Sequence, residues 1–141
     1  MRPALCIVVP VLDEAPTLAD RLRALETFRR RGARVVVVDG GSRDDTLAIA
    51  LEHADLALRA PRGRASQMNA GAGAARGQVL LFLHADTTLP PAADALIHAA
   101  VAAGAAWGRF DVRIDARHPL LRLVERMMNW RSRLSGIATG D

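Results

Sequence analysis

Carboxylic acids follow three short apolar runs of this chain, and together they could bind a cation or a nucleotide. The three acidic positions are Asp13-Glu14, Asp39 and Asp86. Each lies at or soon after the end of a run rich in valine, leucine and isoleucine: 5–9, 35–38 and 79–83. Carboxylates gathered at one place suit a divalent cation, a ribose or the edge of a base. Whether these carboxylates lie close together depends on how the strands before them are arranged.

The apolar runs are typical of strands that are buried on both faces, as the strands of parallel sheets are. In an open parallel sheet, ligands bind outside the carboxyl ends of the strands. We therefore expect all three acidic segments to face one crevice. Helical patterns alternate with the runs, so the sequence predicts an α/β domain with a parallel sheet and right-handed crossovers.

Apolar periodicity, proline and glycine place the individual elements. Helices are expected near 16–31, 45–53, 67–75, 90–103 and 119–134. Strands are expected at 5–9, 34–38, 56–58, 79–83 and, with looser alternation, 106–115. The length of 141 residues corresponds to about one domain, which we assign to the whole of 1–141.

Composition limits the compartment and the class of protein. The single cysteine, Cys6, lies in the first predicted strand, where we expect a buried and inert thiol. The sequence shows no signal-peptide pattern and no run of ~18–20 apolar residues, the length of a membrane span. These observations favour a cytoplasmic protein.

Arginine supplies all 19 basic residues, and the net charge is +4. Arg62 and Arg64 lie in a loop at the predicted crevice, where their guanidinium groups match phosphate oxygens; a solvated loop is the alternative. An arginine-rich nucleic-acid-binding module would show strongly salt-dependent binding to any duplex. Only 4% of the residues are aromatic and none is tyrosine, which argues against base stacking. We expect no nucleic-acid partner.

Two common phosphate-binding turns are absent from the sequence. A dinucleotide-binding domain places G-x-G-x-x-G directly after its first strand, but residues 10–14 contain no glycine. A P-loop requires a lysine, and the chain has none. What remains is a nucleotide fold that handles a diphosphate through a carboxylate-bound metal.

Four motifs carry a resemblance to a known family. They are Val9-Pro10-Val11-Leu12-Asp13-Glu14, residues 38–46 (VDGGSRDDT), Asn69-Ala70-Gly71 with Ala75-Arg76-Gly77, and His84-Ala85-Asp86. In this order, at these strand ends, the chain resembles the family 2 glycosyltransferases from about Leu5 to its last residue. The resemblance implies the GT-A fold, a mostly parallel open sheet with helices on both faces. Residues 63–69, 82–87 and 107–110 resemble the bacterial arsenosugar-biosynthesis-type branch.

The resemblance implies a function and two metal-binding residues. A sugar would pass from a nucleoside-diphosphate sugar, UDP-linked, to an unknown acceptor with the help of Mn²⁺ or Mg²⁺. Asp86 would bind the metal, or else cap the next helix. His84 stands where the family carries a first aspartate, and imidazole suits Mn²⁺ better than Mg²⁺. His84 could equally bond a phosphate oxygen or a backbone carbonyl.

The other implied roles concern the nucleotide. Asp39 would accept hydrogen bonds from the base, typically uracil, or serve only as a turn residue before a glycine. Pro10 and Glu14 would contact the nucleoside, although Glu14 also complements the positive end of the first helix. Arg64 would clamp the diphosphate or reach the ribose, and Asn69 would bond the nucleoside.

Direct displacement of the sugar needs a general base, which relatives carry further along the chain. Within this sequence Asp141 is the candidate base. We therefore expect the donor-binding portion of a longer enzyme, truncated at its C-terminus. The alternatives are a nucleotidyltransferase that makes sugar nucleotides, and a non-catalytic fragment that binds them.

The last predicted helix, 120–134, is amphipathic and basic. Such a helix could lie on a membrane surface near a lipid-linked acceptor. We favour instead that its apolar stripe packs on the sheet or on further elements of the enzyme. The oligomeric state, the donor sugar and the stereochemical outcome have no signal in the sequence.

Overall fold

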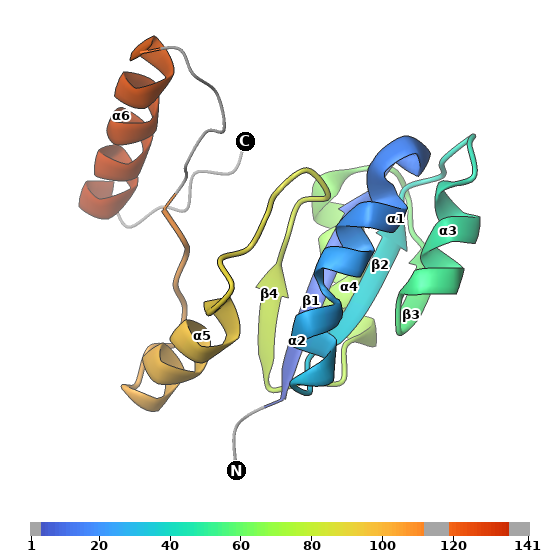
Figure 1. Cartoon of the computed structure of the whole chain (residues 1–141), viewed down its shortest axis with the longest axis horizontal. Coiled ribbons are helices and arrows are strands. Elements are labelled where there is room, and N and C mark those ends of the chain that lie inside the picture. The colour runs from blue at the N-terminus through green and yellow to red at the C-terminus, as the bar shows by residue number, and fades with distance from the viewer. Residues whose placement is uncertain (1–3, 112–118, 136–141) are drawn as a thin grey trace. The chain divides into compact units, whose positions relative to one another are not determined.

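The computed structural model describes residues 4–111 and 119–135, and the chain divides into two compact units, residues 1–100 and 101–141. The first unit contains β1 (Leu5–Val11), α1 (Ala15–Ala24), α2 (Glu26–Arg30), β2 (Arg34–Asp39), α3 (Thr46–His53), β3 (Leu56–Arg59), α4 (Arg64–Ala74) and β4 (Val79–Phe82) (Figure 1). Helix α5 (Ala93–Ala102) runs across the boundary, and α6 (Pro119–Ser135) belongs to the second unit.

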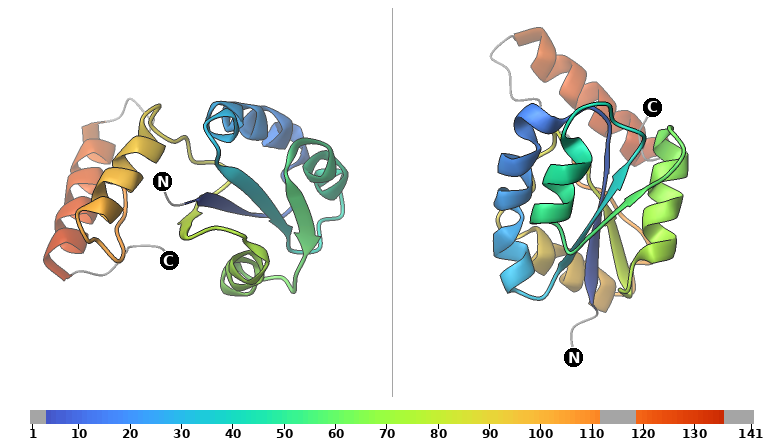
Figure 2. Two further views of the ribbon diagram at one scale, coloured as in Figure 1. Left: turned by 90° about the horizontal axis from the view of Figure 1, so that it is seen from below. Right: turned by 90° about the vertical axis from the view of Figure 1, so that its right-hand side faces the viewer.

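The four strands form one parallel sheet in the order β3-β2-β1-β4. Helices α1, α2 and α3 cover one face of this sheet and α4 covers the other (Figure 2). The expected α/β fold, with a parallel open sheet and helices on both faces, is therefore confirmed. Strand β1 is central and pairs with β2 as far as Val11 opposite Asp39.

Strands β1 and β2 are buried on both faces because helices cover both faces. Cys6 and Val8 of β1, with Val36 and Val38 of β2, form a buried cluster against which Ala70 of α4 packs. The alternate side chains of β1 and β2 point to the opposite face, towards α1 and α2. A continuous apolar run is thus the pattern that this position in the fold requires. Cys6 is fully buried as expected, and burial raises the pKa of its thiol.

Helix α4 approaches β1 very closely at Gly71. A methyl group placed there would lie 2.3 Å from Cγ1 of Val8 and 3.0 Å from Cγ2 of Val38. A methyl group at Gly73, two residues along the same helix, would meet nothing within 4 Å. Gly71 therefore sets the distance between helix and sheet, whereas Gly73 does not.

Two elements differ from the sequence expectation. The single helix expected over 16–31 is interrupted at Leu25, which divides it into α1 and α2. Residues 106–111, which were expected to begin a fifth strand, have no strand structure, and 112–115 lie outside the described residues. Trp107 is exposed, which is consistent with an irregular segment, because a strand packed within a sheet would bury so large an apolar side chain.

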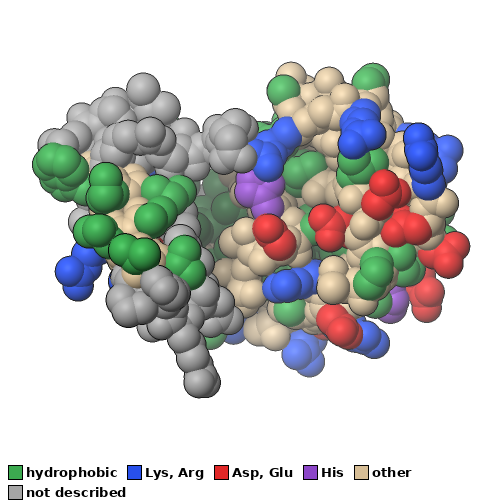
Figure 3. Space-filling view, turned by 90° about the horizontal axis from the view of Figure 1, so that it is seen from above, with side chains coloured by type: hydrophobic (Ala, Val, Ile, Leu, Met, Phe, Trp, Pro, Cys, Tyr) green, Lys and Arg blue, Asp and Glu red, His purple; other side chains and the backbone are tan. Residues whose placement is uncertain are grey.

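In the second unit, α6 presents its apolar side chains to solvent (Figure 3). The exposed residues are Leu120, Leu123, Val124, Met127 and Trp130. Arg109 donates from Nη2 to the carbonyl of Asn129 at 3.1 Å and lies 3.5 Å from Asp111. Among the described residues, no helix has the length and apolar character needed to cross a membrane.

Asp55 joins α2 to the start of β2 and gives the fold a pH-dependent contact. Its Oδ2 accepts hydrogen bonds from the backbone N–H of Val35 at 2.7 Å and from Nε of Arg29 at 3.0 Å. Burial opposes ionisation of this carboxyl group, but the hydrogen bonds from Arg29 and Val35 outweigh it and hold the pKa of Asp55 below its usual value.

We expect Asp55→Asn to lower the free energy of unfolding at pH 7 by about 1–2 kcal/mol, since it removes charge-assisted hydrogen bonds. A carboxyl group whose pKa is lowered in the folded state stabilises fully above its unfolded pKa of about 3.9, and this stabilisation is lost as the pH falls through the folded pKa. The difference between wild type and variant should therefore shrink below about pH 4. Urea unfolding from pH 7 to pH 3 measures it, with the exposed Glu52→Gln as control. A difference that is constant with pH would contradict the assignment.

Candidate functional site

An open cleft of about 350 Å³ lies at the carboxyl ends of β1 and β4. Three segments line it: 10–14 at the end of β1, 62–67 at the start of α4, and 84–86 after β4. Strand β4 pairs with β1 only as far as Phe82 opposite Val8, so the following residues run alongside the end of β1. The cleft is thus formed by turns that the central strands position.

The position of the cleft follows from the strand order. The chain adds β2 and β3 on one side of β1, and then places β4 on the other side. The turns that leave β1 and β4 diverge at this reversal, and such switch points are where open parallel sheets bind ligands. The cleft lies at the reversal. A crevice is therefore present at the strand ends as expected, but only the acidic segments after β1 and β4 line it, and that after β2 does not.

Five of the predicted site residues line this cleft. They are Pro10, Glu14, Arg64, His84 and Asp86, and Arg62 lines it with them. Glu14 and His84 are partly buried, whereas Asp86, Arg62 and Arg64 are exposed. Two carboxylates, one imidazole and two guanidinium groups from three separate segments therefore share one open site.

Asp39 lies below the loop that follows β2 and does not line the cleft. Its side chain is fully buried, and its Oδ2 accepts hydrogen bonds from the backbone N–H groups of Gly41 and Ser42, both at 3.1 Å. The hydroxyl of Ser42 donates to its Oδ1, and Nε of Arg59 lies 3.7 Å from Oδ2. In this structure the carboxylate of Asp39 holds its own loop, as a turn aspartate does.

Asn69 is also outside the cleft. It lies on α4, and its side chain is exposed. The candidate base, Asp141, lies outside the described residues.

The turn after β1 is fastened to the loop after β2. The backbone N–H of Asp13 donates to Oγ of Ser42 at 2.9 Å, and Oδ1 of Asp13 accepts from the N–H of Arg43 at 2.8 Å. Asp13 has a φ of 52°, a left-handed conformation that aspartate adopts more readily than most residues. The two loops therefore support each other through a residue that turns the chain sharply towards Glu14.

A second set of contacts fastens the start of α1 to the start of α3. The backbone N–H of Glu14 donates to Oγ1 of the buried Thr46 at 2.8 Å, and the N–H of Ala15 donates to Oδ2 of Asp44 at 3.1 Å. Asp44 also accepts from Thr46, and these hydrogen bonds, led by that from the Thr46 hydroxyl, hold the pKa of Asp44 below its usual value. The backbone of Glu14 is thus held in place by Thr46, and the residue lines the cleft.

Gln67 was not among the predicted site residues, although it lines the cleft and its side chain is almost completely buried. Its Nε2 donates to the carbonyl oxygens of Val11 at 2.8 Å and Val38 at 2.9 Å. Its Oε1 accepts from the N–H of Gly63 at 3.4 Å. A glutamine in a predicted helix carries no signal of such a role, because glutamine is an ordinary helix residue.

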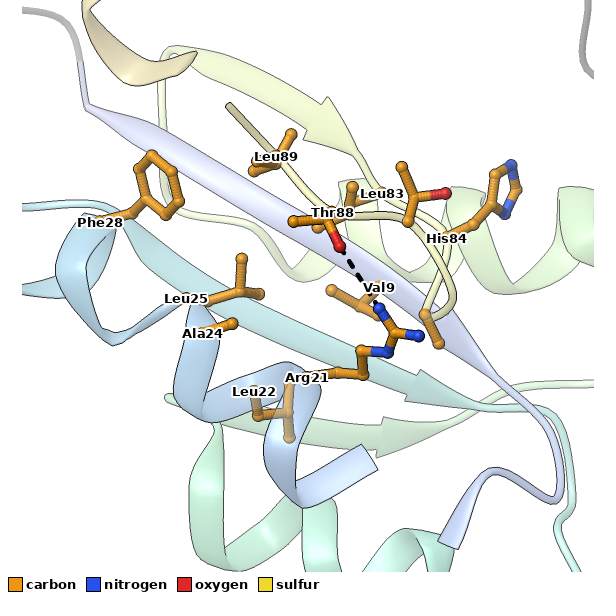
Figure 4. A pocket seen from close by; sticks show the side chains of 12 residues that line it. Val9, Arg21, Leu22, Ala24, Leu25, Phe28, Leu83, His84, Thr88 and Leu89 are labelled. Atoms are coloured by element: carbon orange, nitrogen blue, oxygen red, sulfur yellow. Dashed lines mark hydrogen bonds between the residues drawn. The ribbon is translucent and has the colours of Figure 1, made fainter. Parts of the chain in front are cut away.

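A small apolar cavity of about 60 Å³ lies on the other side of the segment that carries His84 (Figure 4). Apolar side chains of α1, α2, β1 and the β4 loop line it: Val9, Leu22, Leu25, Phe28, Leu83 and Leu89. In Figure 4 the ring of His84 is turned away from these side chains, and Nη1 of Arg21 donates to Oγ1 of Thr88 at 3.4 Å. Of this segment, Thr87 and Thr88 line the cavity, Asp86 lines the cleft, and His84 and Ala85 line both.

The chain is similar to several known structures. A mannosyltransferase from Pyrobaculum calidifontis, solved with GDP-Man and Mn²⁺, is 29% identical with a TM-score of 0.59, over 70% of this chain and 32% of its own. Glucosyl-3-phosphoglycerate synthase from Mycobacterium tuberculosis, solved with Mn²⁺ and UDP, is 19% identical with a TM-score of 0.56, over 64% of this chain and 36% of its own. Mannosyl-3-phosphoglycerate synthase from Rubrobacter xylanophilus is 23% identical with a TM-score of 0.55, over 64% of this chain and 33% of its own.

The matched part thus corresponds to about a third of the length of these proteins, and the likeness below 25% identity supports the fold alone. A comparison with curated protein sequences finds no match. The model of one protein family, described as glycosyl transferase family 2, matches residues 6–137. The parallel sheet, the cleft at its switch point and this match together show that the chain belongs to glycosyl transferase family 2.

Proposed function

We propose that the chain binds the donor of a glycosyltransferase, a UDP-linked sugar, in the cleft between β1 and β4. One observation carries this proposal: the switch-point cleft combines carboxylates, an imidazole and guanidinium groups on three different segments. Guanidinium groups suit a diphosphate, and carboxylates suit a divalent cation that binds one. The motifs at 63–69, 82–87 and 107–110 support the further proposal that the chain belongs to the arsenosugar-biosynthesis-type branch.

Asp86 and His84 would hold the metal, Mn²⁺ in preference to Mg²⁺ because one ligand is an imidazole. Among the described residues, no group of three or more histidine, cysteine or acidic side chains is arranged to hold a metal. Two protein ligands fit a cation that takes its other ligands from substrate phosphates and water, as Mg²⁺ commonly does. When bound, the cation would neutralise negative charge on the departing nucleoside diphosphate.

The remaining residues would orient the nucleotide. Arg62 and Arg64 are at the mouth of the cleft, next to the N-terminus of α4, and would bind the diphosphate. Pro10 and Glu14 would contact the nucleoside from the end of β1, and Asn69 would bond it from α4. Asp39 would accept a hydrogen bond from the base, which requires the loop of Gly41 and Ser42 to open and expose the buried carboxylate.

Sugar transfer would proceed by displacement at the anomeric carbon, with a base that removes the proton of the acceptor hydroxyl. Asp141 is the candidate for this base within the sequence. The matched part corresponds to about a third of the length of the structural relatives. We therefore assign to this chain only the binding of the sugar nucleotide.

Calorimetric titration with UDP and with GDP, each with and without Mn²⁺, tests the proposal. We expect UDP to bind at least about tenfold more tightly with Mn²⁺ than with a chelator, and more tightly than GDP. Absence of binding by both nucleotides, or equal affinity with and without Mn²⁺, would refute the donor site.

The same titration tests the assignment of Asp39 to the base. Asp39→Asn should weaken UDP about tenfold and leave free pyrophosphate unaffected, because pyrophosphate has no base to recognise. Equal losses for the two ligands would assign Asp39 to the loop alone.

A further inference from the structure

The amide of Gln67 connects three of the segments that carry proposed nucleotide ligands. Val11 leads into the turn that carries Glu14, Val38 precedes Asp39, and Gly63 precedes Arg64. Nε2 reaches the first two through their carbonyl oxygens, and Oε1 reaches the third through its N–H. These segments are far apart in the sequence, with separations of 56 and 29 residues between Gln67 and the two carbonyls.

Glutamine has the hydrogen-bonding groups that this place needs. Two carbonyl oxygens require two donors, and one backbone N–H requires an acceptor, which together match the NH₂ and C=O of one side-chain amide. A methionine has the same length without these groups, and a glutamate offers acceptors to two carbonyls. The side chain is only 5% exposed, so water cannot readily replace the lost hydrogen bonds.

Gly40 provides the space that the amide occupies. A methyl group at Gly40 would lie 2.7 Å from Oε1 and 2.9 Å from Cδ of Gln67. The backbone of Gly40 does not have a positive φ, so glycine is not required there for conformational reasons. The amide of Gln67 is thus the nearest obstacle to a larger residue at position 40.

We propose that Gln67 is a positioning residue for nucleotide binding, which holds the β1 turn, the end of β2 and the start of α4 in one arrangement, with Gly40 as its partner in space. The proposal rests on the nucleoside-diphosphate function proposed above. Gln67 acts through Glu14 and Arg64, since its own amide is occupied by backbone groups.

The first test is titration of Gln67→Met with UDP and Mn²⁺. Methionine and glutamine have similar helix propensities, so α4 should remain intact while the three hydrogen bonds of the Gln67 amide are lost. We expect UDP affinity to fall about tenfold, as the loss of buried hydrogen bonds implies. Gln78→Met is the matched control, because Gln78 is exposed and precedes β4 at the opposite end of the sheet; its affinity should equal that of wild type.

Amide hydrogen exchange without nucleotide separates positioning from general stability. In Gln67→Met the N–H groups of Gly40 and Gly63 should exchange about tenfold faster, because their segments lose a shared anchor. The N–H of Ala54, which bonds to Ala50 at the end of α3, should be unchanged. Faster exchange throughout the sheet would make Gln67 a residue of general stability and overturn the proposal.

The pair with Gly40 gives a further test by double-mutant cycle. Gly40→Ala alone should displace the amide and lower UDP affinity about tenfold, whereas the same change in a Gln67→Ala background should have little further effect. Additive losses would overturn the pairing. Wild-type failure to bind nucleotide would refute the proposed function, whereas normal wild-type binding with an unaltered Gln67→Met affinity would refute the positioning role alone.

Discussion

Asp86→Ala is expected to abolish the gain in UDP affinity that Mn²⁺ provides. The carboxylate of Asp86 is exposed in the cleft after β4, and with His84 it forms the proposed protein part of the metal site. Substitutions of residues that support metal ligands commonly reduce metal affinity 10–100-fold, so loss of a ligand itself should remove the whole Mn²⁺-dependent gain, at least about tenfold. Calorimetric titration of UDP with Mn²⁺ measures this loss.

The same variant should behave differently without metal. The negative charge of Asp86 opposes a diphosphate when no cation separates them, so Asp86→Ala should bind metal-free UDP as well as wild type or more tightly. A variant that is merely misfolded would lose affinity under both conditions. Asp20→Ala is the control, since Asp20 is exposed on α1 and pairs with Arg23. Tight Mn²⁺-dependent binding that survives in Asp86→Ala would refute the metal assignment.

Gly71→Ala is expected to destabilise the whole first unit. The added methyl group would lie 2.3 Å from Cγ1 of Val8, a buried side chain of the central strand, so helix or strand must shift. Overpacking of this kind typically costs about 1–3 kcal/mol and here should exceed the gain of up to about 1 kcal/mol in helix propensity. Equilibrium unfolding in urea measures the change.

Gly73→Ala should have the opposite sign and serves as the matched control. It lies on the same helix, its added methyl group meets nothing within 4 Å, and it should stabilise by about 0.5–1 kcal/mol through helix propensity. Stabilisation by both substitutions would mean that α4 is not held against β1 as closely as described.

The fold was largely predictable because the sheet is parallel and covered on both faces. A strand that is buried on both faces has an uninterrupted apolar sequence. All three apolar runs that are followed by acidic residues form strands. Their carboxyl ends share one edge of the sheet, so the approach of Glu14 to Asp86 followed from the fold class alone. The family was also predicted, because its motifs occupy these strand ends.

The break between α1 and α2 had no signal in the sequence. Leu18, Leu22, Leu25 and Phe28 are all buried and keep the spacing of one continuous helix. The helix is nevertheless interrupted at Leu25. Its N–H donates to the carbonyl of Leu22, three residues back, rather than to the residue four back as in an α-helix. The spacing of apolar residues indicates which side chains face the sheet, but it does not change when one helical turn tightens to the 3₁₀ type.

The placement of Asp39 and Gln67 could not be read from residue type. Asp39 ends a strand as expected, but its carboxylate is turned into its own loop by three donors, a choice among local hydrogen bonds that composition does not encode. Gln67 acquires its role from two carbonyl oxygens that only the folded sheet brings together. Long-range contacts of single polar side chains are therefore defined only by the folded structure.

The contacts between the loops of β1 and β2 give the two walls of the cleft different stiffness. On one wall, Asp13 and Glu14 are braced by Ser42, Arg43 and Thr46 through hydrogen bonds of 2.8–2.9 Å. On the other, the side chain of Asp86 accepts a hydrogen bond at 3.2 Å from Thr87, a neighbour within the same segment. We therefore expect a sugar nucleotide of slightly different width to be accommodated by movement of the segment after β4. The turn after β1 should keep its position.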